Sequence, residues 1–199
     1  MLASCSYEKF INLFEYNESL TSIAKIETES IVNKITFSYT NENIIASCSD
    51  SEVSIWDLRK FDKSLKSNEF NDGSRSLNLE FDRQTGLLLH WTKGWVYTYT
   101  DEKFNNPLKY INKNTILTAK FTPFECGFAI LESKNKPHIL QSRYFQIKLH
   151  SLYLNEQDKL DVKHVDFSVG KTETFNDFCF RTDINDLSNQ IICSDSHKK

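Results

Sequence analysis

The sequence predicts an all-β protein made of repeated units of short antiparallel strands. Its apolar residues gather in short runs bounded by polar turn residues, and related segments recur at a step of 43 residues along a chain of 199 residues. A repeat of roughly 40–45 residues built only from short strands is typical of β-propeller blades. We therefore predict an all-β propeller, or a partial propeller of about four to five blades.

The repeat is clearest between two pairs of segments. Residues 2–6 (LASCS) and 45–49 (IASCS) lie 43 positions apart. Residues 10–15 (FINLFE) and 53–57 (VSIWD) follow them, with a difference of one residue in the spacing. Two copies of one pattern at this distance indicate that neighbouring units share one fold.

Two further observations extend the period. Steps of 43 residues from Val53 reach Val96 and then Ile139, where the match is weaker. Short strand-like pieces end at Phe37, Phe81 and Phe121, which are spaced by 44 and 40 residues. The same unit is therefore expected to recur along most of the chain.

The local pattern within one repeat predicts a β-hairpin. Residues 43–48 form a compact apolar run, and residues 49–52 (SDSE) form a turn cluster. Val53, Ile55 and Leu58 then follow at close to every second position. Asp and Ser side chains in such turns bond their own backbone, which fixes the bend.

The next repeat has the same order. Residues 86–91 (GLLLHW) are followed by the turn 92–94 (TKG) and the strand-like segment 95–100 (WVYTYT). We expect Gly94 to adopt a positive φ in this turn, because glycine has no Cβ to clash there.

The pattern is less regular after about residue 142. Residues 144–154 (YFQIKLHSLYL) predict a strand or an extended pair, and residues 154–163 predict a long charged turn. Residues 166–169 and 175–180 predict strands of another blade. We expect one propeller segment over residues 1–193, followed by a polar, frayed tail at residues 194–199.

Residues 45–60 (IASCSDSEVSIWDLRK) resemble the end of a WD repeat. The resemblance implies that Trp56 packs between blades and that Asp50 is the turn aspartate of the repeat. In this family that aspartate joins a hydrogen-bond network with a histidine from a Gly-His pair, and this sequence contains no Gly-His pair. The residues expected to have structural roles are Ser47, Asp50, Val53, Ile55, Trp56 and Asp57.

A narrower resemblance is to the Mio family, subunits of the SEA/GATOR complexes. Residues 53–63 (VSIWDLRKFDK) are similar to the corresponding blade of these proteins, and residues 85–88 (TGLL) occupy the place of a later threonine-glycine-leucine-leucine element. Residues 32–47 are also similar in spacing and pattern. The likeness covers approximately residues 10–100, half of the chain.

The Mio resemblance implies a scaffold role in amino-acid signalling to the TOR kinase complex at the vacuolar or lysosomal surface. Other WD-repeat subunits would be its partners. Members of that family are longer and continue into a helical solenoid and a Cys/His-rich zinc domain, which this sequence does not contain. Leu2 already aligns with an inner strand. We therefore expect a fragment, a truncated product, or a chain completed by a partner.

Composition argues against nucleic-acid and membrane binding. The formal net charge is −3, the mean hydropathy is −0.48, and no apolar run of about 18 residues is long enough to span a bilayer. The five cysteines are scattered without a C-x-x-C pair, which fits a reducing compartment. The first ten residues do not resemble a signal peptide. We expect a cytoplasmic protein that reaches a membrane only through partners, with a nuclear location as the alternative.

The sequence contains no motif for catalysis. It has no phosphate-binding glycine loop, dinucleotide fingerprint or serine nucleophile elbow, and its five histidines do not pair at metal-ligand spacing. His90, beside Trp91, is expected to be a structural imidazole. Asp161, His164 and Asp166 are expected to lie in a solvated turn. We expect no enzymatic activity, no cofactor and no metal.

Two groups of residues are the candidate partner contacts. Arg59 and Lys60 begin a modest basic stretch that suits an acidic partner. Trp91, Trp95 and Tyr97 form an aromatic concentration. We expect these aromatic residues to pack inside the fold, with an exposed binding hot spot as the alternative.

These observations predict a non-catalytic WD-repeat scaffold subunit that binds other proteins, of the Mio type. Two alternatives remain within this class: a scaffold of another complex, in ribosome biogenesis, transcription or the nuclear pore, and an inactive propeller fragment. An enzyme that uses the propeller as a pocket is disfavoured, because the sequence offers no cluster of titratable residues for it.

Overall fold

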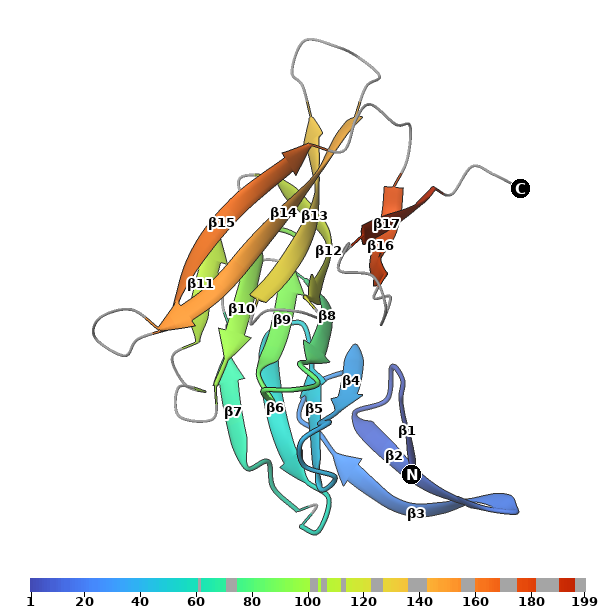
Figure 1. Ribbon diagram of the computed structural model, residues 1–199. Coiled ribbons are helices and arrows are strands. Elements are labelled where there is room, and N and C mark those ends of the chain that lie inside the picture. Colours follow the sequence, from blue (N-terminus) through green and yellow to red (C-terminus); the bar gives the residue numbers. More distant parts are fainter. Residues whose placement is uncertain are drawn as a thin grey trace. The chain divides into compact units, whose positions relative to one another are not determined.

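The computed structural model consists of strands, and the residues it describes include no helix (Figure 1). Side chains are described only up to residue 133, and from residue 134 onward the backbone alone is described. The described residues are 1–60, 62–70, 75–100, 104, 107–111, 114–122, 127–135, 143–154, 160–168, 175–181 and 190–195. This described part of the chain has no helix of the length and hydrophobicity needed to cross a bilayer. The chain divides into two compact units, Met1–Thr92 with Tyr97–Lys109, and Lys93–Val96 with Tyr110–Lys199.

The strands of the described residues form five sheets. The first has the order β1-β2-β3, with β1 (Leu2–Cys5), β2 (Phe10–Asn17) and β3 (Ser19–Glu27). The second has the order β4-β5-β6-β7, with β4 (Lys34–Phe37), β5 (Ile44–Cys48), β6 (Glu52–Asp57) and β7 (Lys66–Glu69). The third has the order β11-β10-β9-β8, with β8 (Ser76–Phe81), β9 (Leu88–Thr92), β10 (Trp95–Tyr99) and β11 (Leu108–Ile111).

The remaining two sheets lie in the second half of the chain. The fourth has the order β12-β13-β14-β15, with β12 (Thr115–Phe121), β13 (Gly127–Asn135), β14 (Arg143–Leu154) and β15 (Leu160–Ser168). The fifth pairs β16 (Phe175–Arg181) with β17 (Gln190–Asp195). Three sheets thus have four strands in sequence order, which is the layout of a propeller blade.

The predicted repeat is confirmed by the strand starts. The four strands of the third sheet begin 42, 44, 43 and 42 residues after their counterparts in the second. The three pieces predicted from phenylalanine spacing are the strands β4, β8 and β12, which end at Phe37, Phe81 and Phe121. The weaker match at Ile139 lies outside the described residues.

The prediction for residues after 142 was partly wrong. Strands β14 and β16 lie where strands were expected. The long turn predicted for residues 154–163 is too long, because β15 begins at Leu160 and pairs with β14 in an antiparallel hairpin. The predicted frayed tail at residues 194–199 is also shortened, since Ser194 and Asp195 belong to β17.

The positive φ expected at Gly94 was wrong. In the described residues Gly86 is the glycine with a positive φ, at 72°, and it lies in the turn between β8 and β9. A Cβ built on Gly86 would lie 2.8 Å from Thr40 Oγ1, whereas one on Gly94 would meet nothing within 4 Å. Gly86 is therefore the position where both backbone and packing require glycine.

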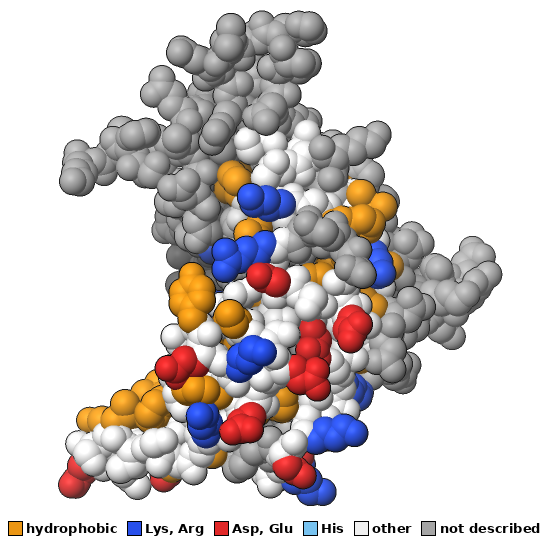
Figure 2. Space-filling model, turned by 180° about the vertical axis from the view of Figure 1, so that it is seen from behind, with side chains coloured by type: hydrophobic (Ala, Val, Ile, Leu, Met, Phe, Trp, Pro, Cys, Tyr) orange, Lys and Arg blue, Asp and Glu red, His pale blue; other side chains and the backbone are white. Residues whose placement is uncertain are grey.

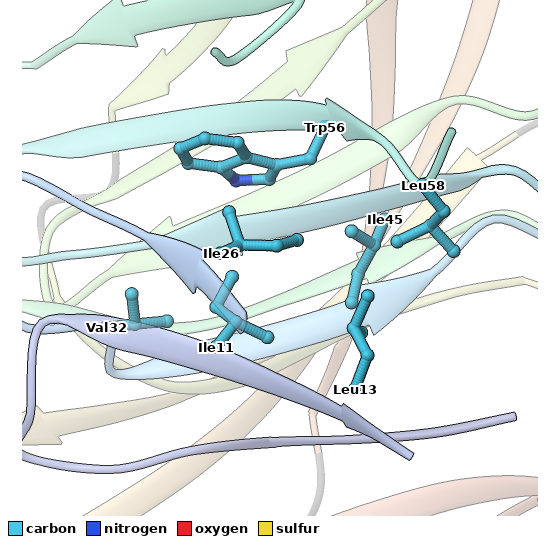
Figure 3. Close-up of a cluster of buried hydrophobic side chains, with 7 residues drawn as sticks. All are labelled: Ile11, Leu13, Ile26, Val32, Ile45, Trp56 and Leu58. Carbon is cyan, nitrogen blue, oxygen red and sulfur yellow. The ribbon is translucent and has the colours of Figure 1, made fainter. Parts of the chain in front are cut away.

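The first two sheets pack against each other through one apolar cluster (Figure 3). Short β-rich segments with apolar residues at alternate positions place one side of each strand in this layer, as in β2, where Ile11 and Leu13 are buried. Burying each such side chain stabilises the fold by about 1.5–3 kcal/mol. The cluster consists of Ile11, Leu13, Ile26, Val32, Ile45, Trp56 and Leu58.

Candidate protein-interaction surface

Trp56 lies between the first two sheets. Its indole N–H donates a hydrogen bond to Ser47 Oγ at 2.8 Å, and the side chain is 7% exposed. Its ring lies beside Ile26 of β3 in the apolar cluster (Figure 3). The neighbouring Val53 is fully buried and Ile55 is half-buried. The polar atom of the tryptophan is thus satisfied inside the layer that the ring fills.

Asp50 lies in the β5–β6 turn and is the centre of a small polar network. Asn33 Nδ2 donates to Asp50 Oδ1 at 2.6 Å, and Arg75 Nε lies 3.3 Å from the same oxygen. Asn33 lies just before β4, so this bond connects the segment that leads into β4 with the β5–β6 turn. Sequence reasoning missed Asn33 and Arg75, because neither carries a motif of its own.

A buried polar group links the second and third sheets. Ser76 Oγ donates to Cys48 Sγ at 3.0 Å and lies 2.9 Å from His90 Nε2. Burial raises the pKa of Cys48 to about 12 and lowers the pKa of His90 to about 3, so both are neutral near pH 7. Because the Ser76 hydroxyl donates its proton to Cys48 Sγ, it can only accept from His90, so His90 Nε2–H is the donor of that bond. His90 Nδ1 has no hydrogen-bond partner among the described residues.

The three side chains of this group are of nucleophile and base types, but they are closed to substrates. Cys48, Ser76 and His90 are 1%, 4% and 0% exposed. The expectation that His90 is a structural imidazole therefore agrees with its position.

An aromatic column continues from His90. Its ring centroid lies 4.6 Å from Phe70 and 5.4 Å from Tyr97, and Tyr97 lies 6.4 Å from Tyr99. Such ring spacings are favourable packing distances. Of the candidate contact residues, Trp91 and Tyr97 are 3% and 2% exposed, which places their rings inside the fold. Trp95 is half-buried.

Asp57 forms a local ion pair at the end of β6. Its Oδ1 accepts hydrogen bonds from the backbone N–H and Nε of Arg59, both at 2.9 Å, and Oδ2 lies 2.7 Å from Arg59 Nη2. These bonds to Arg59 lower the pKa of Asp57 to about 2. Arg59 and Lys60 are exposed, so both remain accessible to a partner even though the arginine charge is partly satisfied.

Exposed apolar side chains lie on the hairpin formed by β2 and β3. Tyr16, Leu20 and Ile23 are 68%, 54% and 48% exposed. On the face seen in Figure 2, hydrophobic side chains lie in several separate groups, and acidic and basic side chains are interspersed rather than separated by sign. Tyr16 and Leu20 are directly paired across the two strands, so their exposed side chains are neighbours on one face of the hairpin.

A second exposed feature lies on the loop side of the first two sheets. A cavity of about 560 Å³ is lined by Cys5, Tyr7, Ile31, Arg75 and other residues of the same compact unit. Tyr7 and Ile31 at this cavity are 80% and 41% exposed. The cavity thus combines apolar contact area with one basic group.

The solvated turn expected for Asp161, His164 and Asp166 was wrong. Asp161, His164 and Asp166 belong to strand β15, because the predicted turn ends earlier. Within residues 1–133, whose side chains are described apart from the gaps given above, no group of three His, Cys, Asp or Glu residues is placed to hold a metal ion.

Comparisons with known proteins define the fold. No protein-family model and no curated protein matches this sequence. Among solved structures 356 chains match. One is a chain of the crystal structure of the mitotic checkpoint complex, with a TM-score of 0.61 and 13% identity. The match covers 86% of this chain and 50% of that chain, so this chain spans half the length of the protein it resembles.

The fold that the repeat and this match define is a β-propeller of the WD-repeat type. The chain has this fold as an all-β propeller or partial propeller, as predicted from the repeat.

Proposed function

We propose that this chain is a non-catalytic scaffold that binds other proteins through its propeller surface. The observation that carries the proposal is the group of exposed apolar side chains on the β2–β3 hairpin. These side chains lie outside the buried apolar cluster between the first two sheets. Exposed aromatic and aliphatic residues on a rigid scaffold are the usual anchors of protein interfaces. The buried position of Cys48, Ser76 and His90 supports a structural rather than catalytic use of the reactive side chains.

We further propose that the partners are subunits of a SEA/GATOR-type assembly and that the chain takes part in TOR signalling at the vacuolar or lysosomal surface. The support is the likeness of residues 53–63 and 85–88 to the Mio family. The Asp57–Arg59 pair and Gly86 show that parts of these two segments have defined structural roles. A cytoplasmic location with recruitment through partners follows from the same proposal.

Affinity purification of the tagged chain from its native cells tests both the scaffold function and the proposed SEA/GATOR-type assembly. We expect stoichiometric recovery of other WD-repeat and zinc-domain subunits, identified by mass spectrometry. A different stoichiometric set would keep the scaffold function and contradict the Mio assignment. Recovery of no partner would contradict both.

A matched pair of variants tests the surface. The double variant Leu20→Ser with Ile23→Ser removes exposed apolar area, so we expect partner affinity to fall by about 30-fold or more, because truncating an anchor residue costs at least about 1 kcal/mol and every change of about 1.4 kcal/mol is tenfold. The control Thr21→Ala with Ser22→Ala changes the same strand without removing apolar area, and recovery should be unchanged. Equal losses in both variants would show that the hairpin is not an anchor.

A further inference from the structure

One side of the first sheet carries apolar residues outside the buried cluster. We call it the free face, and its apolar residues are Leu2, Phe10, Phe14, Tyr16 and Leu20. Those on β2 alternate with Ile11 and Leu13, which point the other way into the buried cluster. Leu2 pairs with Phe14, and Leu20 pairs with Tyr16, so both flanking strands contribute to the same side. One of the hydrophobic groups in Figure 2 lies at the end of the molecule where Figure 1 shows β2 and β3.

The repeat shows that the free face has the composition of a packed surface. Leu2 and Phe14 are paired across β1 and β2 in the same way as Ile45 and Trp56 are paired across β5 and β6. Ile45 and Trp56 pack against the first sheet, and Ile45 is 0% exposed. Leu2, at the equivalent place 43 positions earlier, is 53% exposed. Among the described residues, the free face therefore lacks the layer that covers the equivalent face of the second sheet.

The form of the free face favours a second sheet as the covering layer. Its side chains stand in rows across three paired strands, and the exposed pair Tyr16 and Leu20 continues these rows beyond the buried cluster. Rows of this kind interdigitate with those of another sheet that lies about 10 Å away.

The charges of the free face are self-complementary. By register, Lys25 and Glu27 lie on it two positions apart on β3, and both are exposed. Lys25 Nζ lies 3.7 Å from the centre of the Phe10 ring, which holds the ammonium group over the face. Neither charge forms an ion pair with any residue that the structure describes. Since a two-fold axis makes each contact twice, two such faces can place each Lys25 beside the Glu27 of the other copy.

We infer that the free faces of two copies of this chain pack against each other in an isologous dimer. The apolar rows interdigitate, and Lys25 of each copy pairs with Glu27 of the other. A face of three short strands is small for an interface, so the dimer forms at micromolar concentrations and dissociates on dilution. This inference rests on the proposed scaffold function and names one occupant of the β2–β3 hairpin surface.

Sedimentation equilibrium of the full 199-residue chain, from about 1 to about 200 µM, tests the inference. We expect the mean mass to rise from that of the 23.3 kDa monomer toward twice this value. Tyr16→Ser with Leu20→Ser should raise the dissociation constant by at least about tenfold, because both copies lose exposed apolar contacts. A wild-type chain that stays monomeric overturns the inference, because the free face would then be left to another segment of the same protein or to a different protein.

Tyr7→Ser with Leu65→Ser is the matched control. These residues are of the same two types, are 80% and 52% exposed, and lie outside the free face. The dissociation constant of this variant should equal that of the wild type. Equal weakening in the two double variants overturns the inference, because it would show nonspecific adhesion between exposed apolar groups.

A charge-reversal pair tests the two-fold contact itself. Lys25→Glu and Glu27→Lys should each weaken self-association by at least about tenfold, because each puts like charges opposite one another. Their equimolar mixture should associate with wild-type affinity, since every contact across the axis then joins opposite charges. Circular dichroism shows whether each variant is folded. A mixture of folded variants that associates no better than either variant alone overturns the inference.

The dimer and the proposed function fail separately. If the chain is monomeric while affinity purification recovers other proteins in stoichiometric amounts, the dimer is overturned and the scaffold function stands. If the chain dimerises as expected and recovers no other protein, the scaffold function fails and the dimer stands.

Discussion

At the residue scale, the hydrogen bond between Trp56 and Ser47 joins neighbouring strands β5 and β6 within the apolar layer. Ser47→Ala would leave the buried indole N–H without its partner, so we expect a loss of about 1–3 kcal/mol in the free energy of unfolding. Trp56→Ala removes the ring itself, and we expect a loss of about 3–5 kcal/mol. Urea denaturation measures both values.

Ser19→Ala is the control for this pair, because Ser19 is exposed at the start of β3 and its change should alter stability by less than about 0.5 kcal/mol. A Ser47→Ala variant as stable as Ser19→Ala would contradict the role given to the buried hydrogen bond.

His90 gives the stability of the fold a defined dependence on pH. Burial lowers its pKa to about 3, while the unfolded chain protonates it near its usual value of 6.5. The unfolded state therefore binds more protons between these values, and the free energy of unfolding falls as the pH drops below 6.5. At pH 5 the histidine alone should have removed about 2 kcal/mol relative to pH 7.

The comparison variant for this prediction is His90→Gln, which does not titrate. Urea unfolding of both proteins at pH 7, 6 and 5 should show the stability difference between them shrinking by about 2 kcal/mol. A difference that stays constant with pH would show that His90 is not held neutral in the fold.

Single residues also show what the sequence is able to predict. The Trp56-Asp57 dipeptide and the turn residue Asp50 could be found because they carry a recognisable local pattern. Asn33 and Arg75 could not, because they reach Asp50 across 17 and 25 positions of sequence and only the fold brings them there.

At the element scale, the turn between β8 and β9 depends on Gly86. Gly86→Ala would place a Cβ 2.8 Å from Thr40 Oγ1 and would hold an alanine at a positive φ. We expect a loss of about 1–2 kcal/mol in the free energy of unfolding, because L-residues are disfavoured in that conformation. Thermal or urea denaturation checks the value.

Gly94→Ala is the matched control. Its Cβ would meet no atom within 4 Å, and the residue has no positive φ, so we expect a neutral or slightly stabilising change. Equal destabilisation by both substitutions would contradict the special role of Gly86.

The β14–β15 hairpin shows why the first half of β15 escaped prediction, while its end, residues 166–168, lies where a strand was expected. The apolar residues of β15 change phase along the strand, from Leu160 and Val162 to Val165 and Phe167. Alternation at every second residue is the main sequence signal for a strand, and a phase change in the middle cancels it. The pairing of β15 with β14 from Gln146↔Ser168 to Leu154↔Leu160 exists nonetheless.

At the scale of the whole molecule, the charge distribution predicts no appreciable binding to nucleic acid. The net charge is −3, and positive and negative side chains are interspersed on the face seen in Figure 2. Nonspecific DNA binding requires several clustered cations whose contacts release counterions. We expect no mobility shift of a 20-base-pair duplex by about 10 µM protein at 150 mM salt, and a shift at that concentration would contradict the mixed-charge description.

The repeat itself was predictable as far as β12, because it depends on periodicity alone. The step of 43 residues and the phenylalanine spacing are sufficient to locate β4, β8 and β12. The sequence did not specify which polar side chains hold each blade, because these change from one repeat to the next.

The difference in polar side chains between successive repeats has a consequence for folding. Asn33, Ser47 and Trp56 lie 43 positions before Ser76, His90 and Tyr99, so equivalent places in two successive blades hold different polar groups. A strand that paired with the wrong repeat would leave His90 without the Ser76 hydroxyl, or Trp56 without Ser47, inside an apolar layer. Successive blades with identical polar groups would exchange strands at little cost, as repeat proteins do when they misassemble. The polar groups that differ between blades thus favour pairing of each strand within its own blade and disfavour strand exchange between similar repeats.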